Sequence, residues 1–363
     1  MGVIGYKYKG LFMNNIIKQF TRCCQKHINF IIGLIIPLLI FNLSCQSESN
    51  YIMAVSGPIH PGEMGTTLEH EHVLVDFIGA DSTGYHRWKR NEVINTVLPY
   101  LEEAKDKGLN TIIECTPAYL GRDPVLLKKL FKETNINIIT NTGYYGAVDN
   151  KYLPKHAFEE SVDQLAERWI NEWKNGIEST DVKPGFIKIS VSPDSLLSGL
   201  HEKLIRAAAR THLSSGLTIA SHTGSEDPAL AQLKILEEEG VSPQAFIWVH
   251  AQNGDSEARI KAAKKGAWIS FDGVRNKNDV IENYVKMLSK MRDKDLLNRV
   301  LISHDAGYYA PDEPKGGDYR SYTPIFNKLV PALKDKGFTE KEIDMLLKQN
   351  PQKAFQVSKK EIG

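Results

Sequence analysis

Eight short apolar runs rich in β-branched residues recur along the chain from residue 73 onward, and longer amphipathic stretches separate them. This alternation is typical of βα units arranged around a parallel sheet. Eight such units in order predict an α/β fold, the closed TIM (β/α)8 barrel. The runs are VLVDFI from Val73, NTIIECT from Asn110, INIITNTG from Ile136, GFIKIS from Gly185, LTIASHTG from Leu217, AFIWVHA from Ala245, AWISFDG from Ala267 and RVLISHD from Arg299.

Helices are expected between these runs, and several should end at glycines placed just before the next strand, as helix C-caps are. A small hairpin is expected within residues 52–67, and a terminal helix at 339–357. A doubly wound open sheet is the structural alternative, but it more often has a glycine-rich phosphate loop after its first strand, and this sequence has none. The other expected helices cover residues 91–107, 157–174, 201–215 and 279–291, and the glycines are Gly108, Gly216, Gly240 and Gly266.

Residues 1–45 have the layout of an export signal. A basic segment precedes an apolar run over residues 28–43, which is shorter than the roughly 20 residues of a spanning helix, so a cleaved signal is favoured. Cys45 follows in a Leu-Ser-Cys sequence that resembles the lipidation site of bacterial lipoproteins, although Asn42 departs from the usual aliphatic residue. Cleavage by an ordinary signal peptidase and an uncleaved anchor are the alternatives.

We therefore expect an exported protein of the bacterial cell envelope, anchored as a lipoprotein or free in the periplasm. Residues 46–50 are expected to form a tether and residues 51–363 one barrel domain. With 45 basic and 44 acidic residues the formal charge is +1, so no net field attracts nucleic acid, and membrane contact is expected only through the amino terminus. Three of the four cysteines lie within the first 45 residues, which argues against a disulfide framework.

The strongest local signal is His70-Glu71-His72, at the start of the first expected strand. Residues two apart in a strand point to the same face, so both imidazoles can reach one metal ion. A single His-x-His is weak support for a metal site, because histidine is often a surface or packing residue.

Four more residues of metal-binding type stand at the carboxyl ends of later expected strands, where barrel active sites are built. Each has an ordinary alternative: a lysine whose amine reaches out of the barrel, hydrogen-bonded histidines, and an aspartate that caps a helix. By strand alternation His304 should point away from the interior, so it is left out. The four residues are Lys188, His222, His250 and Asp305.

These residues and their surroundings resemble the phosphotriesterase family of the amidohydrolase superfamily. The similarity covers roughly residues 60–357. It rests on TLEHEHVLVD, the lysine of GFIKIS, SHTG, VHAQ and SHD, which occur in the family's order and at its approximate strand positions. Taken jointly, these motifs are specific to the family.

The resemblance implies a centre of two divalent metal ions held by six strand-end residues: His70, His72 and Asp305 on one ion, His222 and His250 on the other, and Lys188 between them. A free ammonium cannot bind a cation. A lysine neutralised by burial and nearby positive charge can instead react with carbon dioxide to give a carbamate, which binds metal like a carboxylate. Zinc suits such ligands best, and manganese, iron or cobalt could replace it.

Beside Lys188, the catalytic residue implied is Asp305, a general base that touches metal and accepts a proton from the bridging hydroxide. Tyr144 and Tyr145 follow the third expected strand, where they either bind a substrate oxygen or simply line the pocket. Arg275 follows the seventh, where it either pairs with an anionic group of the substrate or is a solvated loop residue.

The activity implied is hydrolysis of a small-molecule ester by attack of a metal-bridging hydroxide. A lactone or carboxylic ester is the expected natural substrate, with phosphotriester hydrolysis as a side activity. The loops at residues 275–279 and 307–320 are expected to determine specificity. The alternative is an exported barrel that binds a metal or ligand without catalysis. Related barrels often dimerise, so a homodimer is one expected assembly.

Overall fold

The computed structural model describes residues 50–193 and 196–362. The predicted signal peptide, the predicted lipidation site at Cys45 and nearly all of the predicted tether lie outside these residues. From Asn50 onward the described chain forms one compact unit. None of its described helices combines the length and the apolar character that a membrane-spanning helix requires.

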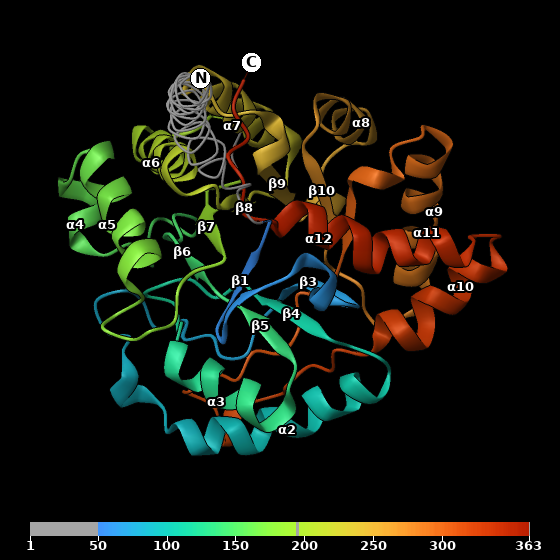
Figure 1. Ribbon diagram of the computed structural model, residues 1–363, viewed down its shortest axis with the longest axis horizontal. Helices are drawn as coiled ribbons and strands as arrows, with labels where there is room; N and C mark the ends of the chain where they lie inside the picture. Colours follow the sequence, from blue (N-terminus) through green and yellow to red (C-terminus); the bar gives the residue numbers. More distant parts are fainter. Residues whose placement is uncertain (1–49, 194–195, 363) are drawn as a thin grey trace, which may run out of the picture. The chain divides into compact units, whose positions relative to one another are not determined.

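Parallel strands form the centre of this unit, with helices around them (Figure 1). Each strand is short and buried, and its neighbour in the sheet is its neighbour in sequence. The strands are β3 (Thr67–Glu71), β4 (Thr111–Glu114), β5 (Asn137–Ile139), β6 (Asn141–Thr142), β7 (Phe186–Ser190), β8 (Thr218–His222), β9 (Phe246–Val249), β10 (Trp268–Phe271) and β11 (Val300–Ile302).

The strands make two parallel ladders, β3–β4–β5 and β6 through β11. β5 and β6 are separated only by Thr140, whose carbonyl accepts a hydrogen bond from the backbone of Gly185. At the other seam the backbone N–H of Asp305, just after β11, donates to the carbonyl of His70 on β3 at 3.0 Å. These contacts bring the first and last strands together, and the predicted TIM barrel is confirmed.

Helices follow the strands around the outside, and the expected helices at 91–107, 201–215 and 279–291 are present. The expected helix at 157–174 is broken at Ser161, whose hydroxyl caps the second part by accepting from the backbone of Gln164. The helices are α2 (Arg90–Asp106), α3 (Pro124–Thr134), α4 (Lys155–Glu159), α5 (Val162–Asn175), α6 (Gly199–Ser215), α7 (Glu226–Glu238), α8 (Ser256–Lys265), α9 (Asn278–Asp293), α10 (Val330–Asp335), α11 (Glu340–Asp344) and α12 (Asn350–Phe355).

The terminal elements and glycines also match the sequence expectations. β1 (Ile52–Ala54) and β2 (Gly57–Ile59) form the predicted antiparallel hairpin. The terminal helix expected at 339–357 is present as α11, a π-helical segment at Met345–Gln349 and α12, which follow one another without a break from Glu340 to Phe355. All four predicted capping glycines have positive φ, between 77° and 107°. Glycine is the residue that adopts this conformation without steric strain.

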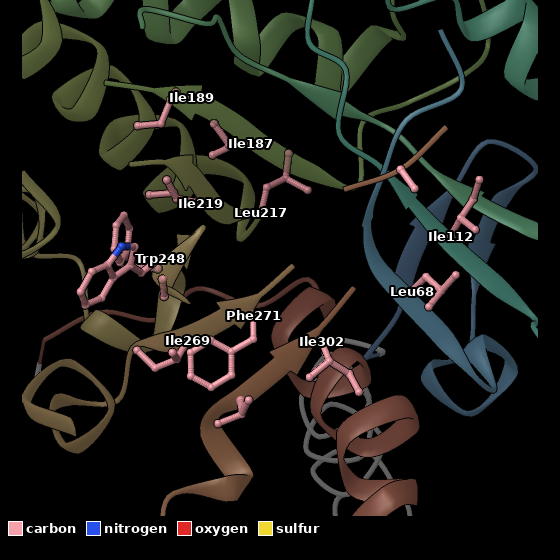
Figure 2. Close-up of a cluster of buried hydrophobic side chains, with 14 of the residues drawn as sticks. Leu68, Ile112, Ile187, Ile189, Leu217, Ile219, Trp248, Ile269, Phe271 and Ile302 are labelled. Atoms are coloured by element: carbon pink, nitrogen blue, oxygen red, sulfur yellow. The ribbon is translucent and has the colours of Figure 1, made fainter. Parts of the chain in front are cut away.

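Apolar side chains alternate between two layers along each strand, which fixes what points into the barrel. Ile187 and Ile219 belong to the large cluster between strands and helices, shown in Figure 2. Phe186 and Ala220, their neighbours in sequence, belong to the smaller cluster inside the barrel. Lys188 and His222 are two residues further on from this second pair, so they continue the inward face toward the carboxyl end.

The first strand differs from the prediction. The expected strand at Val73–Ile78 is an irregular segment, buried from Val73 to Asp76 and exposed at Phe77 and Ile78, and the actual strand β3 precedes it. His70 and His72 therefore lie at the end of the first strand and not at its start. The backbone of Val75 bonds to Tyr309 and that of Asp76 to Leu120, both in neighbouring loops. The segment is apolar because these loops bury it, a cause that hydrophobicity alone cannot separate from a strand.

Candidate metal centre and active site

Three of the predicted ligands meet where β3 and β11 end. Nε2 of His72 lies 3.1 Å from Oδ1 of Asp305, and Nε2 of His70 lies 3.7 Å from the same oxygen. One ligand atom from each residue lies within 4.8 Å of the other two, and both histidines are buried. The three side chains can therefore bind one ion.

A β-bulge in β3 turns His70 toward this site. The register pairs Leu68 with Ile112 but Glu71 with Glu114, so β3 has one residue more than β4 between the two pairs. Leu68 packs in the outer cluster, and strict alternation would point His70 outward as well. The extra residue reverses the alternation, and His70 reaches the interior.

His222 and His250 form the second half of the cluster. His222 ends β8, and His250 follows β9 in the left-handed conformation, with φ of 59°. Nε2 of His250 lies 2.8 Å from Nδ1 of His222. The two rings therefore converge on one point from neighbouring strands.

Asp272, fully buried just after β10, holds His250 in this position. Its carboxylate lies 2.9 Å from the backbone nitrogen and 2.6 Å from Nδ1 of His250. These bonds offset a backbone conformation that costs about 1–3 kcal/mol in a non-glycine residue. With its Nδ1–H donated to Asp272, His250 presents the Nε2 lone pair to the site, the form that binds metal.

Lys188 lies between the two halves of the cluster. Its side chain is 1% exposed, and Nζ lies 3.5 Å from Nε2 of His70. Within residues 50–193 and 196–362, no carboxylate oxygen lies within 4.0 Å of Nζ. Lys188 is therefore a buried lysine without an ion pair in the described part of the chain, placed beside the imidazole of His70.

Burial and charge set the protonation states that cation binding requires. Burial lowers the pKa of His70 and His222 well below the ordinary value, and neighbouring positive groups lower both further. Burial alone would raise the pKa of Asp305, but the hydrogen bond from His72 and the charge of His70 hold it below its usual range. Near neutral pH the site thus offers uncharged imidazoles at His70 and His222 and an ionised carboxylate at Asp305.

His250 is the exception among the four histidines. Burial alone would lower its pKa, but the negative charge and hydrogen bond of Asp272 outweigh burial, and the pKa of His250 is raised. The same contact lowers the pKa of Asp272. Asp272 therefore polarises the ring of His250 and holds it in the orientation in which it can bind a metal ion.

A cavity of about 70 Å³ opens onto the cluster, and its walls are mostly apolar: Val75, Phe77, Leu120, Tyr145 and Tyr308. The hydroxyl of Tyr145 lies 3.1 Å from Nε2 of His222. This geometry places Tyr145 against the cluster and in the wall of the cavity.

The other two residues predicted to bind substrate are placed differently. Tyr144 faces a separate cavity and bonds through its hydroxyl to Nε2 of His156 at 2.9 Å. Nη2 of Arg275 lies 3.9 Å from Oδ2 of Asp305 and 3.4 Å from its carbonyl, at the edge of the site.

Sequence reasoning missed several residues that contact the predicted ligands, among them Asp272 and Tyr308. Asp272 lies within the seventh apolar run and directly follows β10, so the strand-end rule that selected Asp305 could also have found it. Tyr308 donates its hydroxyl to Oδ1 of Asp305, and its ring lies 4.5 Å from that of His72. Tyr308 lies in the loop at residues 307–320 expected to determine specificity, but no motif singles out this tyrosine. His304 points away from the site, as expected, toward Glu71 and the backbone of Ile325.

The residues present fit two divalent ions. Three imidazole and carboxylate donors converge on one side, two imidazoles on the other, and a buried lysine with no acidic partner within the described ranges lies between them. Neutral imidazole and ionised carboxylate are the ligands that zinc and its neighbours prefer.

Comparison with known proteins identifies the family to which this chain belongs. Residues 50–355 match the sequence model of the Phosphotriesterase family. The chain belongs to the phosphotriesterase family. An aryldialkylphosphatase from Saccharolobus solfataricus is 32% identical over 308 residues, which cover 82% of this chain and 96% of that protein. An N-acetyltaurine hydrolase from Xenopus tropicalis is 25% identical, with 84% of this chain and 98% of that protein covered.

A solved structure has the same fold as this chain. That structure comes from work described as "Molecular Engineering of Organophosphate Hydrolysis Activity from a Weak Promiscuous Lactonase Template". It superimposes with a TM-score of 0.74 at 22% identity, covering 84% of this chain and 99% of that one. The named relatives in the phosphotriesterase family are hydrolases, and hydrolysis is the reaction class that membership supports.

Proposed function

We propose that this member of the phosphotriesterase family is a metal-dependent hydrolase of a small carboxylic ester or lactone. The observation that carries the proposal is the convergence of His70, His72 and Asp305 within 4.8 Å of one another, beside Lys188, in one cavity. A protein that only binds a ligand does not require an ionised carboxylate in the wall of its cavity, whereas hydrolysis requires a proton acceptor there.

His70, His72 and Asp305 would hold one divalent ion, zinc in the first place, and His222 with His250 the other. Lys188, as a carbamate, would join them. When bound, the ions supply a water-derived nucleophile near neutral pH and polarise the scissile group.

The chain's own residues bind the substrate and handle its protons. Asp305, with its pKa held low, accepts a proton at the carboxylate oxygen Oδ2 or Oδ1 and passes it toward the leaving group. Tyr308 fixes the orientation of that carboxylate. Tyr145 donates its hydroxyl to a substrate oxygen, and the apolar walls exclude water.

The choice of a carbonyl substrate rests on the similar solved structure, whose description names a weak promiscuous lactonase template together with organophosphate hydrolysis. The names of the two relatives define the competing substrates, an aryl dialkyl phosphate and an N-acyl amide.

The test combines metal analysis with activity. The purified full chain, a Lys188→Ala variant and a Lys183→Ala control are analysed for bound metal by mass spectrometry. Each is assayed against a lactone, an aryl ester, a phosphotriester and an N-acyl amide. Lys183 precedes β7 and does not line the cavity, so its variant should behave as wild type.

We expect about two ions per chain in wild type, with metal and lactone hydrolysis lost together in Lys188→Ala. Preferred turnover of the phosphotriester or amide would overturn the substrate assignment and leave the metal site intact. Wild-type protein without stoichiometric metal, or full activity in Lys188→Ala, would contradict the bridged site and favour a non-catalytic binding protein.

A further inference from the structure

A second cavity lies beside the metal centre. It holds about 460 Å³, within the range of sites that bind small molecules. Its walls come from the loop before α2, the loop between β4 and α3, and the outer surface of α5 with the segment that follows. It opens at the carboxyl end of the barrel, the face where barrel proteins bind ligands.

The two cavities share walls. In the loop after β4, Pro117 and Leu120 line the metal-site cavity, whereas Tyr119 and Arg122 line the second one. After β6, Tyr145 faces the first and Tyr144 faces the second. The second cavity is therefore separate from the reaction site but stands against its wall, and the metal-site chemistry does not use it.

Arg122 forms the floor of this cavity. Its side chain is 1% exposed, and it binds Glu172 through two parallel hydrogen bonds of 2.7 and 2.9 Å. Glu178 lies 3.6 Å from the same guanidinium. Nε of Arg122 is buried and makes no hydrogen bond to any residue in the described part of the chain. The guanidinium of Arg122 is therefore fixed in place by two carboxylates at the bottom of the cavity, unlike a solvated arginine on the surface.

The charges of the lining cancel. Arg122 and Arg168 are balanced by Glu172 and Glu178, and Arg168 is itself paired with Glu160 outside the lining. The cavity therefore has no excess charge that would select an ion. Planar polar groups remain, which are suited to hydroxyl groups that can donate and accept at once.

Free hydrogen-bonding groups and aromatic faces complete the lining. Within residues 50–193 and 196–362, the hydroxyls of Tyr119 and Ser179 make no side-chain hydrogen bond, and the amide nitrogen of Asn171 has no acceptor. Tyr85, 42% exposed, and Trp88 supply aromatic surface. Aromatic rings offer apolar faces to a ring compound while the polar groups bind its edge.

The backbone around the cavity is held in an uncommon conformation. Tyr119, Glu178 and Ser179 have φ of 64°, 49° and 63°. Each such residue costs on the order of 1–3 kcal/mol, and strained residues of this kind gather at binding sites. Their side chains point at the same cavity.

From these contacts we propose that the second cavity binds a neutral, hydroxyl-rich ring compound, a saccharide of one or two rings. The sugar ring lies against Tyr85 and Tyr119, and its hydroxyls bond to the amide nitrogen of Asn171 and to the hydroxyls of Tyr119 and Ser179. This site is independent of the hydrolytic reaction proposed above.

The test is direct binding to the purified full chain. Glucose, N-acetylglucosamine and maltose are titrated by calorimetry, with tetramethylammonium and inorganic phosphate as ionic probes. Asn171→Trp, on the exposed surface of α5, fills the cavity. Lys174→Trp, three residues further along the same helix, is exposed, does not line the cavity and is the matched control. Lactone hydrolysis without sugar reports whether each variant is folded.

We expect one saccharide to bind at one site with a dissociation constant on the order of 1 mM. Its affinity should fall at least about tenfold in Asn171→Trp and stay unchanged in Lys174→Trp. No saturable sugar binding, or binding of the ionic probes alone, would overturn the assigned ligand chemistry. Equal sugar binding by Asn171→Trp with normal hydrolysis would overturn the location.

Discussion

Tyr144 and Tyr145 are neighbours in the sequence that serve different cavities. Tyr145 contacts His222 in the metal cluster, whereas Tyr144 bonds to His156 and packs its ring against Trp169 at 5.3 Å. Their side chains diverge because consecutive residues in extended backbone point in opposite directions. The pair thus provides a natural comparison between a residue at the site and a residue behind it.

Removing each hydroxyl should separate these roles. Tyr145→Phe should lower kcat/KM for the lactone about tenfold, since about 1.4 kcal/mol of interaction with the reacting group is lost. Tyr144→Phe should leave kcat/KM within about twofold and lower the free energy of unfolding by about 1 kcal/mol, through its lost bond to His156. Steady-state kinetics and urea unfolding measure both. Equal kinetic effects of the two variants would contradict the assignment of Tyr145 to substrate binding.

At the scale of elements, tight packing between neighbouring strands positions the ligands. Gly143, just after β6, has φ of 111°, and a Cβ atom there would stand 2.1 Å from the backbone oxygen of Lys188. Only glycine allows β6 and β7 to come this close. The position of Lys188 therefore depends on a residue that bears no functional group.

Gly143→Ala should be compared with Gly108→Ala. Gly108 also has positive φ, at 95°, but no atom lies within 4 Å of its added Cβ. Both variants carry backbone strain, and Gly143→Ala adds overpacking of about 1–3 kcal/mol. It should therefore unfold at lower urea concentration and bind less metal. If the two variants lose equal stability, the close approach to Lys188 does not matter.

The carboxyl-terminal segment is attached to α6 through a buried histidine. Nδ1 of His212 lies 2.8 Å from the carbonyl of Leu217, and Nε2 accepts from the backbone N–H of Lys360 at 2.9 Å. Only the neutral ring satisfies both contacts, since a proton on Nε2 would face another N–H. Burial lowers the pKa of His212 to about 4.

This histidine should make stability depend on pH. Because its pKa is about 4 folded and 6.5 unfolded, the unfolded chain binds more protons between these values. Stability from His212 is complete above pH 6.5 and falls as pH decreases toward 4, by about 3 kcal/mol in total. Urea unfolding across this window should show a shallower pH dependence in His212→Gln than in wild type. His86→Gln, at an exposed position, should match wild type; an identical profile in all three would refute the role.

At the scale of the whole molecule, the metal centre joins parts of the chain that are far apart in sequence. Its residues run from His70 to Asp305 and come from β3, β7, β8 and the ends of β9 and β11. Ions that bind only the folded chain stabilise it by mass action. Ions bound at the proposed centre would therefore also stabilise the closed barrel.

Removing metal should lower global stability. Protein dialysed against a chelator should unfold at lower temperature than protein reloaded with zinc, with a difference of about 4 kcal/mol when free zinc is 1,000 times the dissociation constant. Calorimetry measures both forms, and Lys188→Ala provides the control because it should show little response to zinc. Identical midpoints for the two wild-type forms would exclude a metal bound specifically to the native fold.

The sequence by itself determined the barrel, its strand order and the strand-end residues, because period-2 burial and βα alternation are local patterns that persist in the fold. Tertiary structure alone decided which residues meet. The bulge in β3 reverses the face of His70, Asp272 supports His250 from another strand, and Tyr144 turns away from the site where Tyr145 enters it. Such contacts depend on the register and packing between distant segments. The spacing of apolar residues within a single segment does not specify these contacts.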